Sequence, residues 1–203
     1  MQPSSSRGLQ QESLFLSAFG NAELAKLLSQ DRWPLSINTG LIGPPGAGKT
    51  SFLKLLKRRL ESRPEVCVAY VDCRDLQTSA PEVAYRRVLG ELITVSHSVS
   101  CSRDMTECSD MEELKQVLQQ YADAGAHVLL ILDHLDAIGR IPSLSTTFLG
   151  AVRSLCSAPA ISAVCASDSS PLDFADFRRV GSSLVQSLVT HAIKRTSGSQ
   201  QEA

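Results

Sequence analysis

The chain has 203 residues, of which 43% are hydrophobic and 20% charged, and its net charge is -1. This length suits one domain with a full core and short tails. The nearly neutral charge gives no general attraction to nucleic acid or acidic lipid. No apolar run reaches the roughly 18–20 residues of a membrane span, and the polar N-terminus lacks the apolar segment of a secretory signal. We therefore expect an intracellular protein without membrane contact.

The apolar pattern predicts helices and strands in alternation, between polar tails at 1–12 and 193–203 that should be disordered. Helices are expected at 12–30, 49–62, 80–95, 110–125 and 145–157, and strands at 35–43, 65–73, 127–132 and 160–167. Ser109 or Asp110 should cap the helix at 110–125, and Gly125 should end it. Apolar strands that alternate with helices indicate a parallel sheet covered on both faces.

The six cysteines form no C-x-x-C pair, and most lie in apolar segments, where a free cysteine behaves as a small hydrophobic residue. A metal site of His97, Cys101 and Cys108 is disfavoured, because three loosely spaced ligands in the serine-rich loop at 96–109 do not match known metal-site spacings. The basic run at 54–59 is the best candidate for a DNA contact. On a helix, however, a solvated charged face explains it better.

The segment GPPGAGKT, residues 43–50, matches the pattern G-x-x-x-x-G-K-[ST] between an expected strand and an expected helix. Its glycines allow backbone N–H groups to surround phosphates at the positive end of the helix. Lys49 should reach the β- and γ-phosphates, and the Thr50 hydroxyl should bind Mg²⁺. The predicted nucleotide contacts are Gly43, Pro44, Pro45, Gly46, Ala47, Gly48, Lys49, Thr50 and Ser51.

These features predict one P-loop nucleotide-binding domain over residues 13–192. We expect a three-layer α/β/α sandwich with a mainly parallel, five-stranded sheet. Asp133, at the end of the strand HVLLIL, should hold Mg²⁺ through water on the strand beside the P-loop. The chain has no N-K-x-D segment for reading guanine, so we predict ATP with Mg²⁺ as the cofactor.

The P-loop, the stretch VAYVDCRDLQTSAPEVAYRRVLGEL (68–92) and the stretch LLILDHLD (129–136) resemble the AAA+ ATPases of the origin-recognition-complex and Cdc6-like initiator clade. The resemblance covers about residues 13 to 185. It implies an ATP-binding module in a hetero-oligomeric assembly, in DNA replication initiation or another DNA-associated complex. It also implies a nuclear location in a eukaryote and a cytoplasmic one otherwise. The charge of the chain gives no support for a DNA contact.

The clade's Walker B motif reads D-E-x-D, but here it reads Asp133-His134-Leu135-Asp136. His134 replaces the glutamate that activates water, and an imidazole that is protonated beside Mg²⁺ and phosphates cannot act as a base. The resemblance implies a sensor-1 role for Ser167, which would orient water or the γ-phosphate. The catalytic candidates are therefore His134, Asp136 and Ser167.

Two further departures concern the arginine finger and the segments after the P-loop domain. Ser183 stands where the clade has an arginine finger, although Arg178 or Arg179 could serve instead. We expect neither the clade's helical lid nor its winged helix. Together with His134, these departures predict weak or absent hydrolysis. An active ATPase switch of the STAND type remains an alternative, and a small-molecule kinase is a less favoured one.

Overall fold

The computed structural model describes residues 38–77, 80–95, 110–139, 141, 143–169 and 189–192. The expected helix at 12–30, both tails, the loop at 96–109, and Arg178, Arg179 and Ser183 lie outside the described residues. The described strands are β1 (Thr39–Ile42), β2 (Val66–Asp72), β3 (His127–Asp133), β4 (Ile161–Ser167) and β5 (Val189–Ala192). They form one sheet in the order β2-β3-β4-β1-β5, and every neighbouring pair is parallel.

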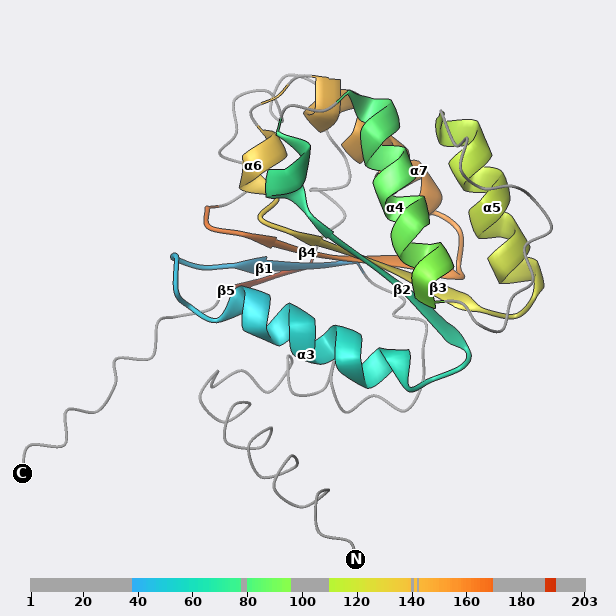
Figure 1. Ribbon diagram of the computed structural model, residues 1–203. Helices are drawn as coiled ribbons and strands as arrows, with labels where there is room; N and C mark the ends of the chain where they lie inside the picture. Colours follow the sequence, from blue (N-terminus) through green and yellow to red (C-terminus); the bar gives the residue numbers. More distant parts are fainter. Residues whose placement is uncertain are drawn as a thin grey trace, which may run out of the picture.

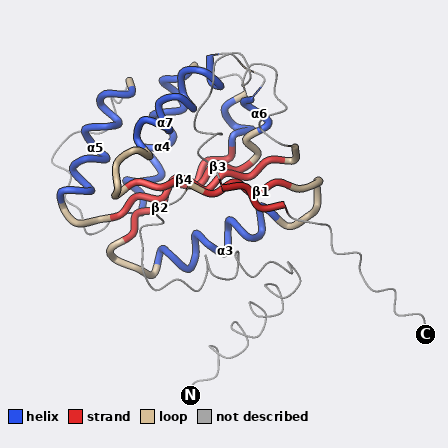
Figure 2. The backbone as a smooth tube through the Cα atoms, turned by 180° about the vertical axis from the view of Figure 1, so that it is seen from behind, coloured by secondary structure: helices blue, strands red, loops and turns tan. Residues whose placement is uncertain are grey.

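Helices cover both faces of this sheet. The helix α3 (Lys49–Glu61) lies on one face, and α4 (Pro81–Val95), α5 (Met111–Asp123) and α7 (Leu149–Leu155) lie on the other (Figure 1). Figure 2 shows the same three layers from behind. Three short elements complete the described part: a 3-10 helix η1 (Cys73–Leu76), the helix α6 (Asp136–Gly139) and a π-helix η3 (Ser143–Phe148). The predicted α/β/α sandwich with a five-stranded parallel sheet is confirmed.

The side chains of β2 show why the sheet is covered on both faces. Val68 packs with Phe52 and Leu56 of α3, whereas Ala69 and Val71 belong to the cluster under α4, α5 and α7. Successive side chains of a strand point to opposite faces, so an apolar strand needs a helix on each side. The apolar positions of α3 supply one of these layers.

The order of the strands differs from the expectation at one point. The strand that ends at Asp133 was expected beside the P-loop strand, but β4 lies between β3 and β1. Every residue of β4 is buried, and such a strand is best accommodated inside a sheet, with a neighbour on each edge. The expectation of direct neighbours was wrong because chain order does not fix strand order in a parallel sheet.

Local signals placed some helix ends well and others poorly. The Asp110 side chain accepts a hydrogen bond from the Glu113 backbone N–H at 2.9 Å, which confirms it as the cap of α5. Gly125 follows that helix with φ of 80°, as its role at the helix end requires. The single helix expected at 145–157 is instead the π-helix η3 followed by α7. β5 has no counterpart among the four segments predicted as strands.

Four of the six cysteines lie within the described residues, and all four are free. Cys67, Cys73 and Cys165 are buried, and Cys156 is partly buried. Burial raises the pKa of the Cys156 thiol to about 12, so this sulfur stays protonated at ordinary pH. These cysteines behave as small hydrophobic residues, as the sequence indicates. None of the described helices is both long and apolar enough to cross a membrane.

Candidate functional site

The loop between β1 and α3 has the conformation that its glycines allow. Gly46 and Gly48 have φ values of 78° and 90°, in the left-handed region that favours glycine. The Ala47 N–H donates to the Pro44 carbonyl at 3.1 Å, and the Gly43 N–H donates to the Ser167 carbonyl at 3.3 Å. The loop is therefore tightly folded against the end of β4. It leads directly into the first turn of α3, whose free N–H groups can bind anions.

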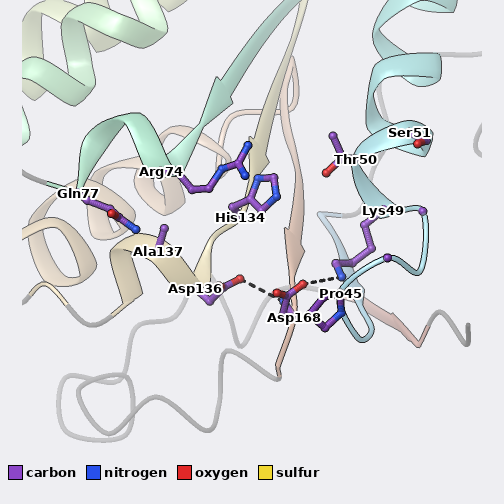
Figure 3. A pocket seen from close by; sticks show the side chains of 12 residues that line it. Pro45, Lys49, Thr50, Ser51, Arg74, Gln77, His134, Asp136, Ala137 and Asp168 are labelled. Atoms are coloured by element: carbon purple, nitrogen blue, oxygen red, sulfur yellow. Dashed lines mark hydrogen bonds and ion pairs between the residues drawn. The ribbon is translucent and has the colours of Figure 1, made fainter.

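A pocket of about 540 Å³ opens at this loop, at the carboxyl ends of the parallel strands. Figure 3 shows Lys49 and Thr50 on one side of it and Arg74 and His134 on the other. Ligand sites of open α/β sheets commonly lie at this edge. The lining residues are Pro45, Gly46, Gly48, Lys49, Thr50, Ser51, Arg74, Gln77, His134, Asp136, Ala137 and Asp168.

Lys49 is held by three acceptors. Its Nζ donates to the Gly43 carbonyl at 2.6 Å and to the Pro44 carbonyl at 3.1 Å, and it pairs with Asp168 Oδ1 at 2.8 Å. Only 8% of the Lys49 side chain is exposed, against 38% of Asp168. The ammonium is thus fixed at the pocket wall, where a phosphate bound by the loop would meet it.

Asp136 holds the end of β4 from the other side of the pocket. Its Oδ1 accepts hydrogen bonds from the Ser167 hydroxyl at 3.2 Å and from the Asp168 backbone N–H at 3.1 Å. The structure thereby brings together Asp136 and Ser167, two of the predicted catalytic residues. Through this oxygen Asp136 fixes the end of β4 at the pocket.

Asp133 is buried behind the pocket, with 1% of its surface exposed, and it is not a lining residue. Its Oδ2 accepts a hydrogen bond from the Tyr70 hydroxyl at 2.7 Å, and its Oδ1 accepts one from the His134 backbone N–H at 2.9 Å. Burial and the bond to Asp133 raise the pKa of the Tyr70 phenol far above its usual value. The hydroxyl therefore remains a donor at every ordinary pH.

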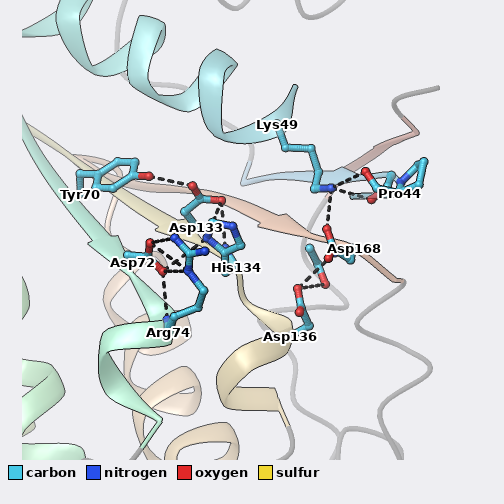
Figure 4. A network of polar contacts seen from close by, with 11 residues as sticks. Pro44, Lys49, Tyr70, Asp72, Arg74, Asp133, His134, Asp136 and Asp168 are labelled. Carbon is cyan, nitrogen blue, oxygen red and sulfur yellow. Dashed lines mark hydrogen bonds and ion pairs between the residues drawn. The ribbon is translucent and has the colours of Figure 1, made fainter. Parts of the chain in front are cut away.

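His134 adopts a left-handed backbone with φ of 53° and directs its Nδ1 toward two carboxylates. Nδ1 lies 3.3 Å from Asp72 Oδ1 and 3.5 Å from Asp133 Oδ1 (Figure 4). Asp72 also binds Arg74 through both of its oxygens, at distances down to 2.6 Å. Hydrogen bonds from Arg74 are the main cause of the lowered pKa of Asp72, which stays ionised. These five side chains, Tyr70, Asp72, Arg74, Asp133 and His134, form the strand-end network.

The pocket fits the phosphates of a nucleotide. It offers a cation at Lys49, the backbone N–H groups of the loop and a hydroxyl at Thr50. Of the two predicted Mg²⁺ ligands, Thr50 and Asp133, Thr50 lines the pocket. Asp133 would hold the metal indirectly, by accepting a hydrogen bond from a water that binds Mg²⁺. Each of its oxygens already accepts one hydrogen bond and can accept a second. The roles of Asp133 and Thr50 as metal ligands stay predictions.

Sequence reasoning named eight of the twelve lining residues and missed Arg74, Gln77, Ala137 and Asp168. It also missed Tyr70. Arg74 lies in η1 and Gln77 directly follows it, and η1 begins at the carboxyl end of β2. Because β2 is the neighbour of β3, residues at this point of the sequence could have been identified as candidates for the site. Asp168 directly follows the predicted sensor-1 residue Ser167 at the end of a strand, and this position could have identified it as a candidate. Of the predicted loop contacts, Gly43, Pro44 and Ala47 support the loop without lining the pocket.

Comparison with known proteins agrees with this geometry. Residues 38–180 match the protein family described as AAA domain. The chain belongs to this AAA domain family. No curated protein is significantly similar to the chain.

The solved structures that are similar to this AAA domain include ORC proteins. The ORC1 protein of Aeropyrum pernix, solved in complex with DNA, is 18% identical with a TM-score of 0.57, over 96% of this chain and 46% of that one. The A. pernix ORC2 protein, in ADPNP–ADP complexes, is 17% identical with a TM-score of 0.59, over 95% and 49%. The Drosophila ORC, bound to GC-rich DNA and Cdc6, is 15% identical with a TM-score of 0.59, over 93% and 30%.

The chain spans about half the length of the two archaeal proteins and less of the Drosophila one. At these identities the similarity establishes the fold. The prediction is thus confirmed for the AAA domain family and for the fold.

Proposed function

We propose that this chain is an ATP-binding AAA+ module that acts in a multiprotein assembly and hydrolyses ATP weakly or not at all. The assembly would serve the initiation of DNA replication or another DNA-associated process, in the nucleus of a eukaryote or the cytoplasm of another cell. The observation that carries the proposal is the pocket itself. It joins the glycine loop, Lys49 and Thr50 to a histidine where an ATPase of this kind has a glutamate.

Binding is supported by the charge and shape of the pocket. Its volume of about 540 Å³ is in the range of small-molecule sites. Lys49 is buried and already fixed against the loop carbonyls, so little side-chain freedom is lost when a phosphate meets it. Bound Mg²⁺ would neutralise phosphate charge and polarise the γ-phosphate, with Thr50 and Asp133 as the residues that would hold it.

Weak hydrolysis is supported by the positions of the two residues that could activate water. His134 replaces the glutamate that the resemblance implies at this position, and its Nδ1 lies near Asp72 and Asp133 without a hydrogen bond to either. The Oδ1 of Asp136 accepts two hydrogen bonds from the end of β4, so this oxygen is already engaged. Loss of a general base typically costs about 10²–10⁴-fold in rate.

An assembly is supported by the cations of the pocket. Among the described lining residues these are Lys49 and Arg74, and Arg74 is held by both oxygens of Asp72. Charge that develops on the γ-phosphate would therefore need a further cation, such as an arginine of a neighbouring subunit, whose effect on turnover is of order 10³–10⁵. The similarity to the Drosophila ORC, solved with DNA and Cdc6, supports the same proposal.

The binding half of the proposal is tested with Lys49→Ala. Removing the ammonium should weaken Mg-ATP binding at least about tenfold, or 1.4 kcal/mol, measured by calorimetric titration. Lys54→Ala is the matched control, because Lys54 lies on the same helix with an exposed side chain away from the pocket. Equal ATP affinity of the wild type and Lys49→Ala would refute the site.

The assembly half is tested by affinity purification of the tagged chain with ATP present. The wild type should retain initiator-type subunits, and Lys49→Ala should lose them if nucleotide stabilises the contact. Copurification with signalling proteins would favour the STAND-type switch instead. Phosphate transfer to a panel of metabolites would favour a kinase.

A further inference from the structure

We propose that Asp168 is an internal competitor of the nucleotide: its carboxylate and the phosphates of ATP compete for the same ammonium of Lys49, and Asp168 thereby sets the affinity of the site. The inference rests on the proposed function, since it concerns the same pocket. Figure 4 shows Asp168 between Lys49 and Asp136.

The competition follows from the donors of Lys49. A lysine ammonium has three N–H groups, and all three are engaged, by Gly43 O, Pro44 O and Asp168 Oδ1. A phosphate oxygen can bind this nitrogen closely only if one acceptor leaves. The two carbonyls belong to the tightly folded loop, whereas the Asp168 side chain is 38% exposed and can rotate away. Asp168 is therefore the acceptor that a phosphate displaces.

The displaced carboxylate stays close to the nucleotide. The backbone N–H of Asp168 donates to Asp136 Oδ1, and the neighbouring Ser167 hydroxyl donates to the same oxygen. These bonds hold the backbone of Asp168 at the pocket wall, so only its side chain can move. Asp136 and Asp168 then present two carboxylates to an incoming polyanion, and like charges at short range oppose its binding.

As a consequence, the site binds nucleotide less tightly than it would without the carboxylate of Asp168. A partner subunit that offers a cation to Asp168 would release Lys49 and strengthen nucleotide binding. Because the coupling between two binding events is reciprocal, bound nucleotide would strengthen the contact with that partner by the same factor. Asp168 thus couples the occupancy of the pocket to the assembly.

The test is Asp168→Asn, which removes the charge but keeps the shape and the backbone N–H. Mg-ATP and Mg-ADP should each bind about tenfold more tightly than to the wild type, which corresponds to 1.4 kcal/mol. Asp75→Asn is the matched control: Asp75 is an exposed carboxylate of η1 that does not line the pocket, and its loss should change affinity less than about twofold. Equal or weaker nucleotide binding by Asp168→Asn would overturn the inference.

A second measurement needs no nucleotide and separates this inference from the proposed function. Lys49 in each variant is acylated with a limiting amount of acetic anhydride and quantified by peptide mass spectrometry. Asp168→Asn should be modified faster at Lys49 than the wild type, with Lys54 as the internal reference. If the variants differ in this way while neither the wild type nor Asp168→Asn binds nucleotide, the ion pair between Lys49 and Asp168 stands, but the proposed function fails and the competition for nucleotide fails with it. Equal modification of Lys49 in both would overturn the inference by itself.

Discussion

The hydrogen bond from Tyr70 to Asp133 gives a sharp prediction for Tyr70→Phe. This change removes one hydroxyl and keeps the aromatic ring. The Lys57 ammonium lies 5.6 Å from the ring centre, and its contact with the ring is therefore retained. Any loss of stability should then come from the hydroxyl and its bond to Asp133.

The magnitude follows from the burial of the acceptor. Asp133 is 1% exposed, and its Oδ2 is 2.7 Å from the Tyr70 hydroxyl. Hydrogen bonds to charged groups contribute about 1.5–3 kcal/mol, so Tyr70→Phe should lower the free energy of unfolding by about 2 kcal/mol. For a chain of this length that corresponds to a fall in Tm of about 4–8 °C.

The assay is urea unfolding of the wild type, Tyr70→Phe, Asp133→Asn and the double variant. In the Asp133→Asn background the acceptor is neutral, and the cost of Tyr70→Phe should fall to about 1 kcal/mol or less. If Tyr70→Phe unfolds within about 0.5 kcal/mol of the wild type, the bond is not a stabilising contact of Asp133 and the strand-end network is wrongly described.

His134→Glu should raise phosphate release measurably if the carboxylate alone is missing, and no change would indicate that a partner's cation limits turnover. Gly46→Ala should cost about 1–2 kcal/mol of stability from its positive φ alone, since nothing lies within 4 Å of an added Cβ, whereas Gly150→Ala in α7 should be neutral or stabilising. Arg74→Ala should lower the free energy of unfolding at pH 7, and its effect should shrink as the pH falls below 3.8. The pKa of Asp72 lies below its usual 3.8, so the ion pair stabilises the fold above that pH and is lost as the pH falls through the lowered pKa; an effect in urea unfolding that does not shrink below pH 3.8 would contradict this.

The parts of the fold that the sequence predicts well depend on neighbouring residues. The turn before α3 requires glycines at fixed positions, and the cap of α5 joins Asp110 to the Glu113 N–H only three residues away. Both patterns are local. The alternation of apolar strands and helices likewise predicts covered layers without any knowledge of which strands are neighbours.

The contacts that shape the site are long-range, and local sequence patterns could not predict them. Lys49 and Asp168 are 119 residues apart, and Tyr70 and Asp133 are 63 apart. Asp72 lies opposite Asp133 only because β2 and β3 pair in that register. Strand order and register decide these contacts, and neither follows from motif spacing.

The most direct test measures bound ATP and phosphate release in one sample of the purified wild-type chain at saturating Mg-ATP. We predict stoichiometric ATP binding that Lys49→Ala weakens, with turnover far below the roughly 1–10³ per second of ordinary enzymes. A wild-type turnover of about one per second, abolished by His134→Ala, would show that His134 is a working base. That result would contradict the proposal that this AAA domain mainly holds its nucleotide.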